Sequence, residues 1–208
     1  MSICNTNIHF LEEEYLFLYS DFIGQFWNSM SSLSFCIVPI FINSTEYVIK
    51  RSNILIVIVG LGSFWFHATC SFTGELVDEV SMLLFSLSIL DGLKHTNPLI
   101  ENSIVPNINR ASLMVTGFYI WQGWHTVFCL VFGITLFIPS VIMVSSKKNK
   151  THLMKAACFM SCAFCCWFLE RLGIWHFLHS FWHILSAFAS YHWIKQLEVH
   201  RAFSWQLQ

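Results

Sequence analysis

The segment that decides the fold is NILIVIVGLGSFWFHATCSF, residues 53–72, which contains no Asp, Glu, Lys or Arg. A helix needs about 20 mostly apolar residues to cross the ~30 Å hydrocarbon core of a bilayer. The segment has this length and composition. Two of its few polar residues, Ser63 and His67, are four positions apart and so share one helix face. We therefore predict a transmembrane helix that carries a functional group.

The rest of the chain has the same character. Of its 208 residues, 55% are apolar and only 11% are charged, and its mean hydropathy is +0.59. Soluble globular proteins carry about 25% charged residues, which cover their water-facing surface. The net charge of −1 gives no basic field for nucleic acid, and no nucleic-acid-binding motif is present. Composition therefore favours a multi-pass membrane protein whose partner is the lipid bilayer and not a nucleic acid.

Seven apolar segments predict an all-α polytopic protein, a seven-transmembrane helix bundle that forms one domain over residues 1–208. The predicted spans are residues 23–43, 53–72, 76–94, 108–122, 125–145, 153–173 and 178–196. The fourth is the weakest, because residues 111–146 are almost continuously apolar and only a short polar stretch at 122–125 indicates a turn. One bent helix in place of spans four and five would leave six spans.

The basic residues predict the orientation, because cytoplasmic loops of membrane proteins are enriched in Lys and Arg. With seven spans, ten of the eleven basic residues fall on one side, and Arg171 is the exception. The ten are Lys50, Arg51, Lys94, Arg110, Lys147, Lys148, Lys150, Lys155, Lys195 and Arg201. The N-terminus is therefore predicted to be lumenal or extracellular and the C-terminus cytosolic. Six spans would put both termini on one side and break this pattern.

Three histidines and a carboxylate are predicted to meet at one depth, near the lumenal face. His67 lies toward the lumenal end of its span, and Asp78 begins the next span. His179 and His183, again four residues apart, begin the last span. An ionisable side chain inside a membrane is costly and therefore needs a partner or a function. Three imidazoles suit zinc and leave a fourth coordination position for water.

Simpler interpretations exist for each of these residues. A single intramembrane histidine is more often a hydrogen-bonded interior residue than a metal ligand, and it is the combination that favours a metal. Among the other seven histidines, only His176 is near enough to be considered. Glu170 and Arg171 lie at the same predicted depth, but adjacent residues do not share a helix face, so we expect them to have separate partners.

At these residues the chain resembles the alkaline ceramidases, a branch of a seven-span hydrolase superfamily that also includes the adiponectin and progestin receptors. The Ser-x-x-x-His element at 63–67 and the His-x-x-x-His element at 179–183 are typical of the superfamily. The Phe-Trp-Asn sequence at 26–28 and the HSFWH sequence at 179–183 resemble the ceramidases more specifically. The predicted lumenal N-terminus also resembles the ceramidases and not the receptor branch, which has the opposite orientation.

The resemblance implies a zinc-dependent intramembrane amidase that hydrolyses ceramide, or a related long-chain N-acyl sphingoid lipid, to sphingosine and a fatty acid. It implies that His67, His179 and His183 bind Zn²⁺. It further implies that Asp78 is the general base and then protonates the leaving amine, while Ser63 helps to hold the oxyanion. An endoplasmic reticulum or Golgi membrane follows from the resemblance alone, and no protein partner is predicted.

The N-terminal segment departs from the family pattern. Family members usually have a calcium site formed by an Asp-Trp-x-Glu-x-Asn segment before span one and a Glu at the start of that span. Here the corresponding segment is LEEEYL at 11–16, and Gln25 precedes Phe26. Depending on the alignment, Glu12 or Glu14 matches, and Glu14 is the residue that we predict to bind Ca²⁺. The alternative is a solvated acidic N-terminus.

Two other functions are weighed against the amidase. A non-catalytic lipid-binding receptor, or a degenerate relative that retains a structural zinc, would explain the altered N-terminal segment. An ion or proton carrier would use the intramembrane carboxylates, but it would not require histidines in this arrangement. The intact set of histidines with Asp78 and Ser63 favours the enzyme.

Overall fold

The computed structural model describes residues 6, 8–93, 113–114, 116–117, 120, 125–145 and 149–204, and every regular element in these ranges is a helix. The elements are η1 (Leu11–Tyr15), α1 (Phe26–Ser32), α2 (Ser34–Ile37), η2 (Val38–Phe41), α3 (Tyr47–Thr69), α4 (Phe72–Gly92), α7 (His125–Ser145), α8 (Thr151–Arg171) and α9 (Leu178–Ser204). The all-α prediction is therefore confirmed for the described residues.

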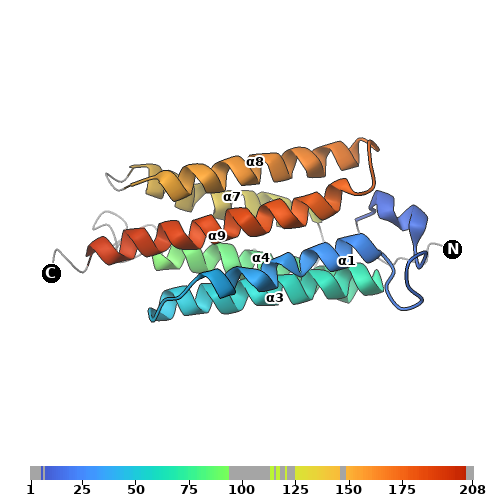
Figure 1. Cartoon of the computed structure of the whole chain (residues 1–208), viewed down its shortest axis with the longest axis horizontal. Coiled ribbons are helices and arrows are strands. Elements are labelled where there is room, and N and C mark those ends of the chain that lie inside the picture. Colours follow the sequence, from blue (N-terminus) through green and yellow to red (C-terminus); the bar gives the residue numbers. More distant parts are fainter. Residues whose placement is uncertain are drawn as a thin grey trace.

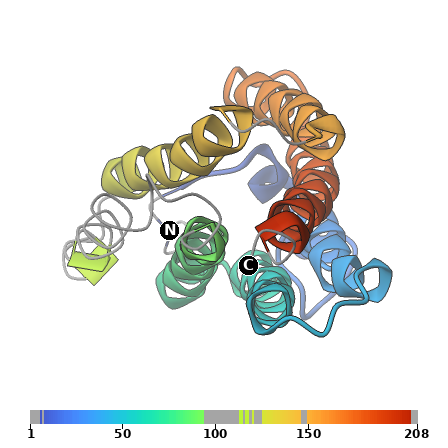
Figure 2. The same ribbon diagram turned by 90° about the vertical axis from the view of Figure 1, so that its left-hand side faces the viewer.

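The long helices lie side by side along one axis, with α3 and α4 forming one antiparallel pair and α8 and α9 another (Figure 1). Seen along that axis, the helices follow one another around a ring in the order α4, α3, α1, α9, α8 and α7 (Figure 2). Apolar side chains such as Ile56, Leu83, Phe132 and Ile194 form the core between them. The N-terminal segment with η1 lies at the end of the bundle where α3 ends and α9 begins (Figure 1).

Five of the predicted spans correspond to the long helices α3, α4, α7, α8 and α9. Three described helices, α3, α7 and α8, are long and apolar enough to cross a membrane. The other two long helices, α4 and α9, also carry ionisable residues, and several of these belong to the site described below. The fourth predicted span lies mostly outside the described residues, so the seven-span count and the orientation stay predictions.

The first predicted span, residues 23–43, differs from the expectation of one continuous helix. It is divided into α1, α2 and η2, and its helical part covers only Phe26–Phe41. Pro39 lies in the first turn of the 3₁₀ helix η2, where its missing N–H is tolerated because no helical hydrogen bond requires it. The result is a short helical segment beside α3 and α9 that brings Gln25, Asn28 and Ser31 toward the histidines.

The connection between α3 and α4 is a tight turn that fixes the relative depth of His67 and Asp78. Cys70 ends α3 in the left-handed conformation, and the Ser71 hydroxyl caps α4 by accepting a hydrogen bond from the Gly74 N–H at 3.2 Å. A Cβ atom at Gly74 would lie 2.7 Å from the Cα of Phe66, so only glycine permits this close approach of the helices. The prediction that the two residues lie at one depth is explained by this turn.

Candidate metal centre

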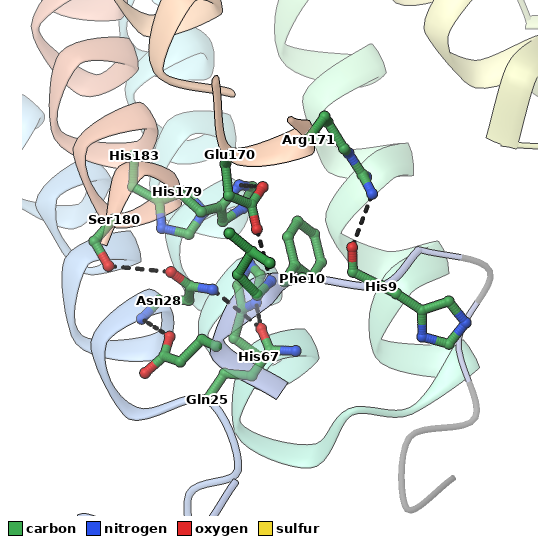
Figure 3. A network of polar contacts seen from close by, with 12 residues as sticks. His9, Phe10, Gln25, Asn28, His67, Glu170, Arg171, His179, Ser180 and His183 are labelled. Atoms are coloured by element: carbon green, nitrogen blue, oxygen red, sulfur yellow. Dashed lines mark hydrogen bonds and ion pairs between the residues drawn. The ribbon is translucent and has the colours of Figure 1, made fainter. Parts of the chain in front are cut away.

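Three histidines from two helices meet at the end of the bundle near η1 (Figure 3). His67 lies in the last turn of α3, whereas His179 and His183 lie in the first two turns of α9. Their potential ligand atoms all lie within 4.8 Å of one another, and all three side chains are buried. Their ring centroids are 5.0 Å apart for His67 to each of the other two and 4.6 Å apart for His179 and His183. The predicted convergence of the three imidazoles is therefore present.

Hydrogen bonding orients His67 and leaves one nitrogen open. Its Nδ1 donates to the Oε1 of Gln25 at 2.6 Å, because a side-chain amide oxygen can only accept. Its Nε2 is buried and has no hydrogen-bond partner among the described residues. Metal-bound histidines usually donate their other N–H to a fixed acceptor, which sets the tautomer and the direction of the lone pair. Gln25 holds His67 in the state that a metal ligand needs.

The two histidines of α9 also have neighbours on their far nitrogens. The Nδ1 of His183 lies 2.9 Å from the Ser31 hydroxyl, and its Nε2 lies 3.4 Å from the Ser63 hydroxyl. The Nδ1 of His179 lies 3.8 Å from the Oε2 of Glu170, a distance at which a small shift would form a direct bond. Hydrogen bonds thus hold the ring of His183, whereas the Nδ1 of His179 has no hydrogen-bond partner among the described residues.

Asp78 lies on α4 beside the three-histidine group. Its side chain is buried, it interacts with the Ser63 side chain, and its Oδ1 has no hydrogen-bond partner among the described residues. Asp78, Ser63, His179 and His183 line one cavity together. A carboxylate and the imidazole groups of His179 and His183 thus face a common space, which supports the predicted placement of Asp78 and Ser63 but leaves their chemical roles as a proposal.

The N-terminal segment covers the histidines. The Phe10 ring packs against His67 and His179, with centroid distances of 5.0 Å and 4.2 Å. The Leu11 N–H donates to the Oε1 of Glu170 at 2.9 Å, and Arg171 donates to the carbonyl oxygen of His9 at 2.8 Å. Glu170 and Arg171 therefore have separate partners, as expected. The N-terminal segment thus packs directly over His67 and His179.

Glu12 anchors this cover to α1. Its carboxylate accepts hydrogen bonds from the backbone N–H groups of Trp27 at 2.6 Å and Asn28 at 2.9 Å, where the first turn of a helix leaves donors free. Burial raises the pKa of Glu12, and these two donors oppose that rise. Glu14, in contrast, is exposed and belongs to neither group of potential metal ligands found among the described residues. Calcium binding by Glu14 stays a prediction.

Sequence reasoning missed Gln25, Asn28 and Ser180 as parts of the site. The Ser180 hydroxyl donates to Asn28 Oδ1 at 3.0 Å, and the Asn28 amide donates to Gln25 Oε1 at 3.2 Å. The chain of bonds thus links α9 to the residue that orients His67 (Figure 3). The signals in the sequence were the position of Gln25 and Asn28 at the Phe-Trp-Asn motif and of Ser180 within the HSFWH motif.

The fold and the site define a class: an all-helical protein with apolar helices and a buried three-histidine group whose donor set fits a tetrahedral zinc ion. Comparison with known proteins identifies the family within this class. The family model described as Ceramidase matches residues 4–207, so the chain belongs to the ceramidase family.

Individual relatives agree with this assignment. The chain is 25% identical to the alkaline ceramidase of Drosophila melanogaster over 203 residues, which cover 84% of this chain and 71% of that protein. It is 25% identical to alkaline ceramidase 1 of Homo sapiens over 200 residues, covering 82% of this chain and 74% of the human protein. It is also 25% identical to alkaline ceramidase 3 of Mus musculus over 202 residues, with 82% and 75% covered.

Proposed function

We propose that this protein is a zinc-dependent intramembrane amidase that hydrolyses ceramide, or a related long-chain N-acyl sphingoid lipid, to sphingosine and a fatty acid. Membership of the ceramidase family supports a hydrolase that acts on an amide C–N bond. The observation that carries the metal is the buried group formed by His67, His179 and His183, with the Nε2 of His67 left open.

The three histidines would hold the zinc ion, which when bound polarises the amide carbonyl and lowers the pKa of water. Asp78 would accept the proton of the attacking water as its oxygen bonds to the carbonyl carbon. It would then give that proton to the amide nitrogen as the C–N bond breaks. Ser63, next to both Asp78 and His183, would donate a hydrogen bond to the carbonyl oxygen as negative charge develops there.

The cavity beside the histidines suits a lipid substrate. Its lining continues from Asp78 along α4, α7 and α9 and is mostly apolar. Phe128, Phe132, Leu136 and Trp193 belong to this part of the lining. Apolar walls with a few polar groups at one end are typical of ligand sites, and here they would bind a hydrocarbon chain with its amide at the histidines.

The membrane setting belongs to the same proposal. A single seven-span domain, with a lumenal N-terminus and a cytosolic C-terminus, would put the histidines near the lumenal face of an endoplasmic reticulum or Golgi membrane. Ceramide would then enter the cavity from the bilayer. The three apolar helices support a membrane protein in general.

The test uses the purified full chain in detergent with a defined ceramide, and mass spectrometry measures sphingosine. Sphingosine release that stops with a zinc chelator and returns with zinc, but is lost in Asp78→Asn, supports the amidase. Zinc bound in stoichiometric amount without turnover of any ceramide in a chain-length series overturns it. That second result supports the non-catalytic lipid-binding receptor instead.

A further inference from the structure

A second group of ligand-type side chains lies between α4 and α7, and the three-histidine centre does not use it. Glu75 and Glu79 are four residues apart on one face of α4, and His125 begins α7 opposite them. Their potential ligand atoms lie within 4.8 Å of one another. Glu75 is 0% exposed and Glu79 is 2% exposed. Two carboxylates are thus held close together inside the protein.

The contacts in this group leave one carboxylate oxygen of Glu79 without a partner among the described residues. The Nδ1 of His125 lies 2.5 Å from the Oε1 of Glu79, and the Nε2 of His125 lies 3.2 Å from the Sγ of Cys129. The other carboxylate oxygen of Glu79, Oε2, is buried and has no hydrogen-bond partner among the described residues. A buried carboxylate oxygen without a partner is costly, and a cation bound there would remove that cost.

We propose that Glu75, Glu79 and His125 form a second site for a divalent transition-metal ion such as zinc. Two carboxylates and one imidazole are ligands that such ions accept. The two carboxylates and the imidazole would bind the ion in their deprotonated forms, as metal ligands do. The ion would join α7 to α4, a pair of helices separated in sequence by residues 93–124.

This second site lies close to the first but has no ligand in common with it. Glu79 and His125 line the same cavity as Asp78 and His183. The ion would compensate the charge of Glu79 immediately next to Asp78 in the sequence. Because metal content can be measured without turnover, the test of this site does not depend on the amidase being correct.

The experiment measures zinc per chain in the purified full-length protein, by mass spectrometry after removal of free metal. The wild type is expected to hold two zinc ions per chain. Glu79→Gln and His125→Asn should each hold one, at the three-histidine group. His67→Ala should also hold one, at the second site. Asp91→Asn makes the same carboxylate-to-amide change on α4, at an exposed ion pair with Arg51, and should keep both ions.

Two results would overturn the proposal. One is a wild type with a single zinc ion that His67→Ala loses completely. The other is a Glu79→Gln protein that keeps both ions. Because a variant can fail to fold, anomalous X-ray scattering at the zinc edge is measured on wild-type crystals. A peak between Glu79 and His125 supports the site, and its absence beside an occupied three-histidine site refutes it.

Discussion

The acidic residues at the two ends of the helical bundle differ in their partners. At the end where α3 begins and α9 finishes, three acidic residues form ion pairs with basic residues: Asp91 with Arg51, Glu46 with Arg201, and Glu198 with Lys195. At the other end, Asp78, Glu79 and Glu170 each keep a buried carboxylate oxygen without a hydrogen-bond partner among the described residues. Paired carboxylates serve stability, whereas buried carboxylate oxygens without a partner indicate ligands and chemistry.

If this contrast reflects function, substitution of a histidine of the three-histidine group should have the largest effect on activity. We expect His67→Ala to abolish sphingosine release and to remove the zinc held by the three-histidine group, because two protein ligands do not hold a catalytic zinc ion firmly. Added zinc should restore chelated wild type but not the variant. The matched control is His176→Ala, a histidine at the same end that contacts Tyr15 and lies outside the group. Full activity in His67→Ala would contradict the assignment.

Asp78→Asn is expected to have the next largest effect. The change preserves shape but removes the proton acceptor, so the rate should fall by ~10²–10⁴-fold, the usual contribution of general acid–base catalysis. Zinc content and thermal stability should stay at the wild-type level. The same substitution at Asp91 should leave the rate nearly unchanged, because Asp91 lies at the end of the bundle where the acidic residues form ion pairs, here called the paired end. Equal losses at both positions would mean that the two ends do not differ in function.

The histidines and Asp78 could be predicted because helix periodicity and alternating span direction fix the depth of a residue without any knowledge of side-chain contacts. Gln25, Phe10 and Glu12 could not be predicted as neighbours of the histidines. They belong to an irregular N-terminal segment and a broken first helix, and their positions depend on tertiary contacts. His125 was predicted correctly as the first residue of a span, and α7 begins there, but its contact with Glu79 could not be predicted from the sequence.

Substitution of Gln25 tests whether a residue that contacts a histidine of the site changes the affinity for zinc. Gln25→Leu removes the acceptor for the Nδ1–H of His67, and residues of this kind typically change metal affinity by about 10–100-fold. Competition with a chromogenic chelator measures the change. Gln25→Glu keeps an oxygen acceptor and should retain most of the affinity, which a general loss of packing would not explain. Unchanged zinc affinity in Gln25→Leu would show that Gln25 does not orient the ligand.

The smallest effect is expected at the paired end, in the ion pair between Arg51 and Asp91. Their side chains are 30% and 36% exposed and their atoms are 2.8 Å apart. Solvent screens a pair of this exposure, so Asp91→Asn should lower the free energy of unfolding by only about 0.2–1 kcal/mol. Arg51 also donates to the carbonyl oxygen of Ser88, so the amide variant leaves that arginine with a partner. Thermal melts in detergent at low and high salt measure the loss, which should shrink as salt rises. A loss comparable to that of removing a buried charge, together with lower activity, would mean that the paired end also shapes the catalytic cavity.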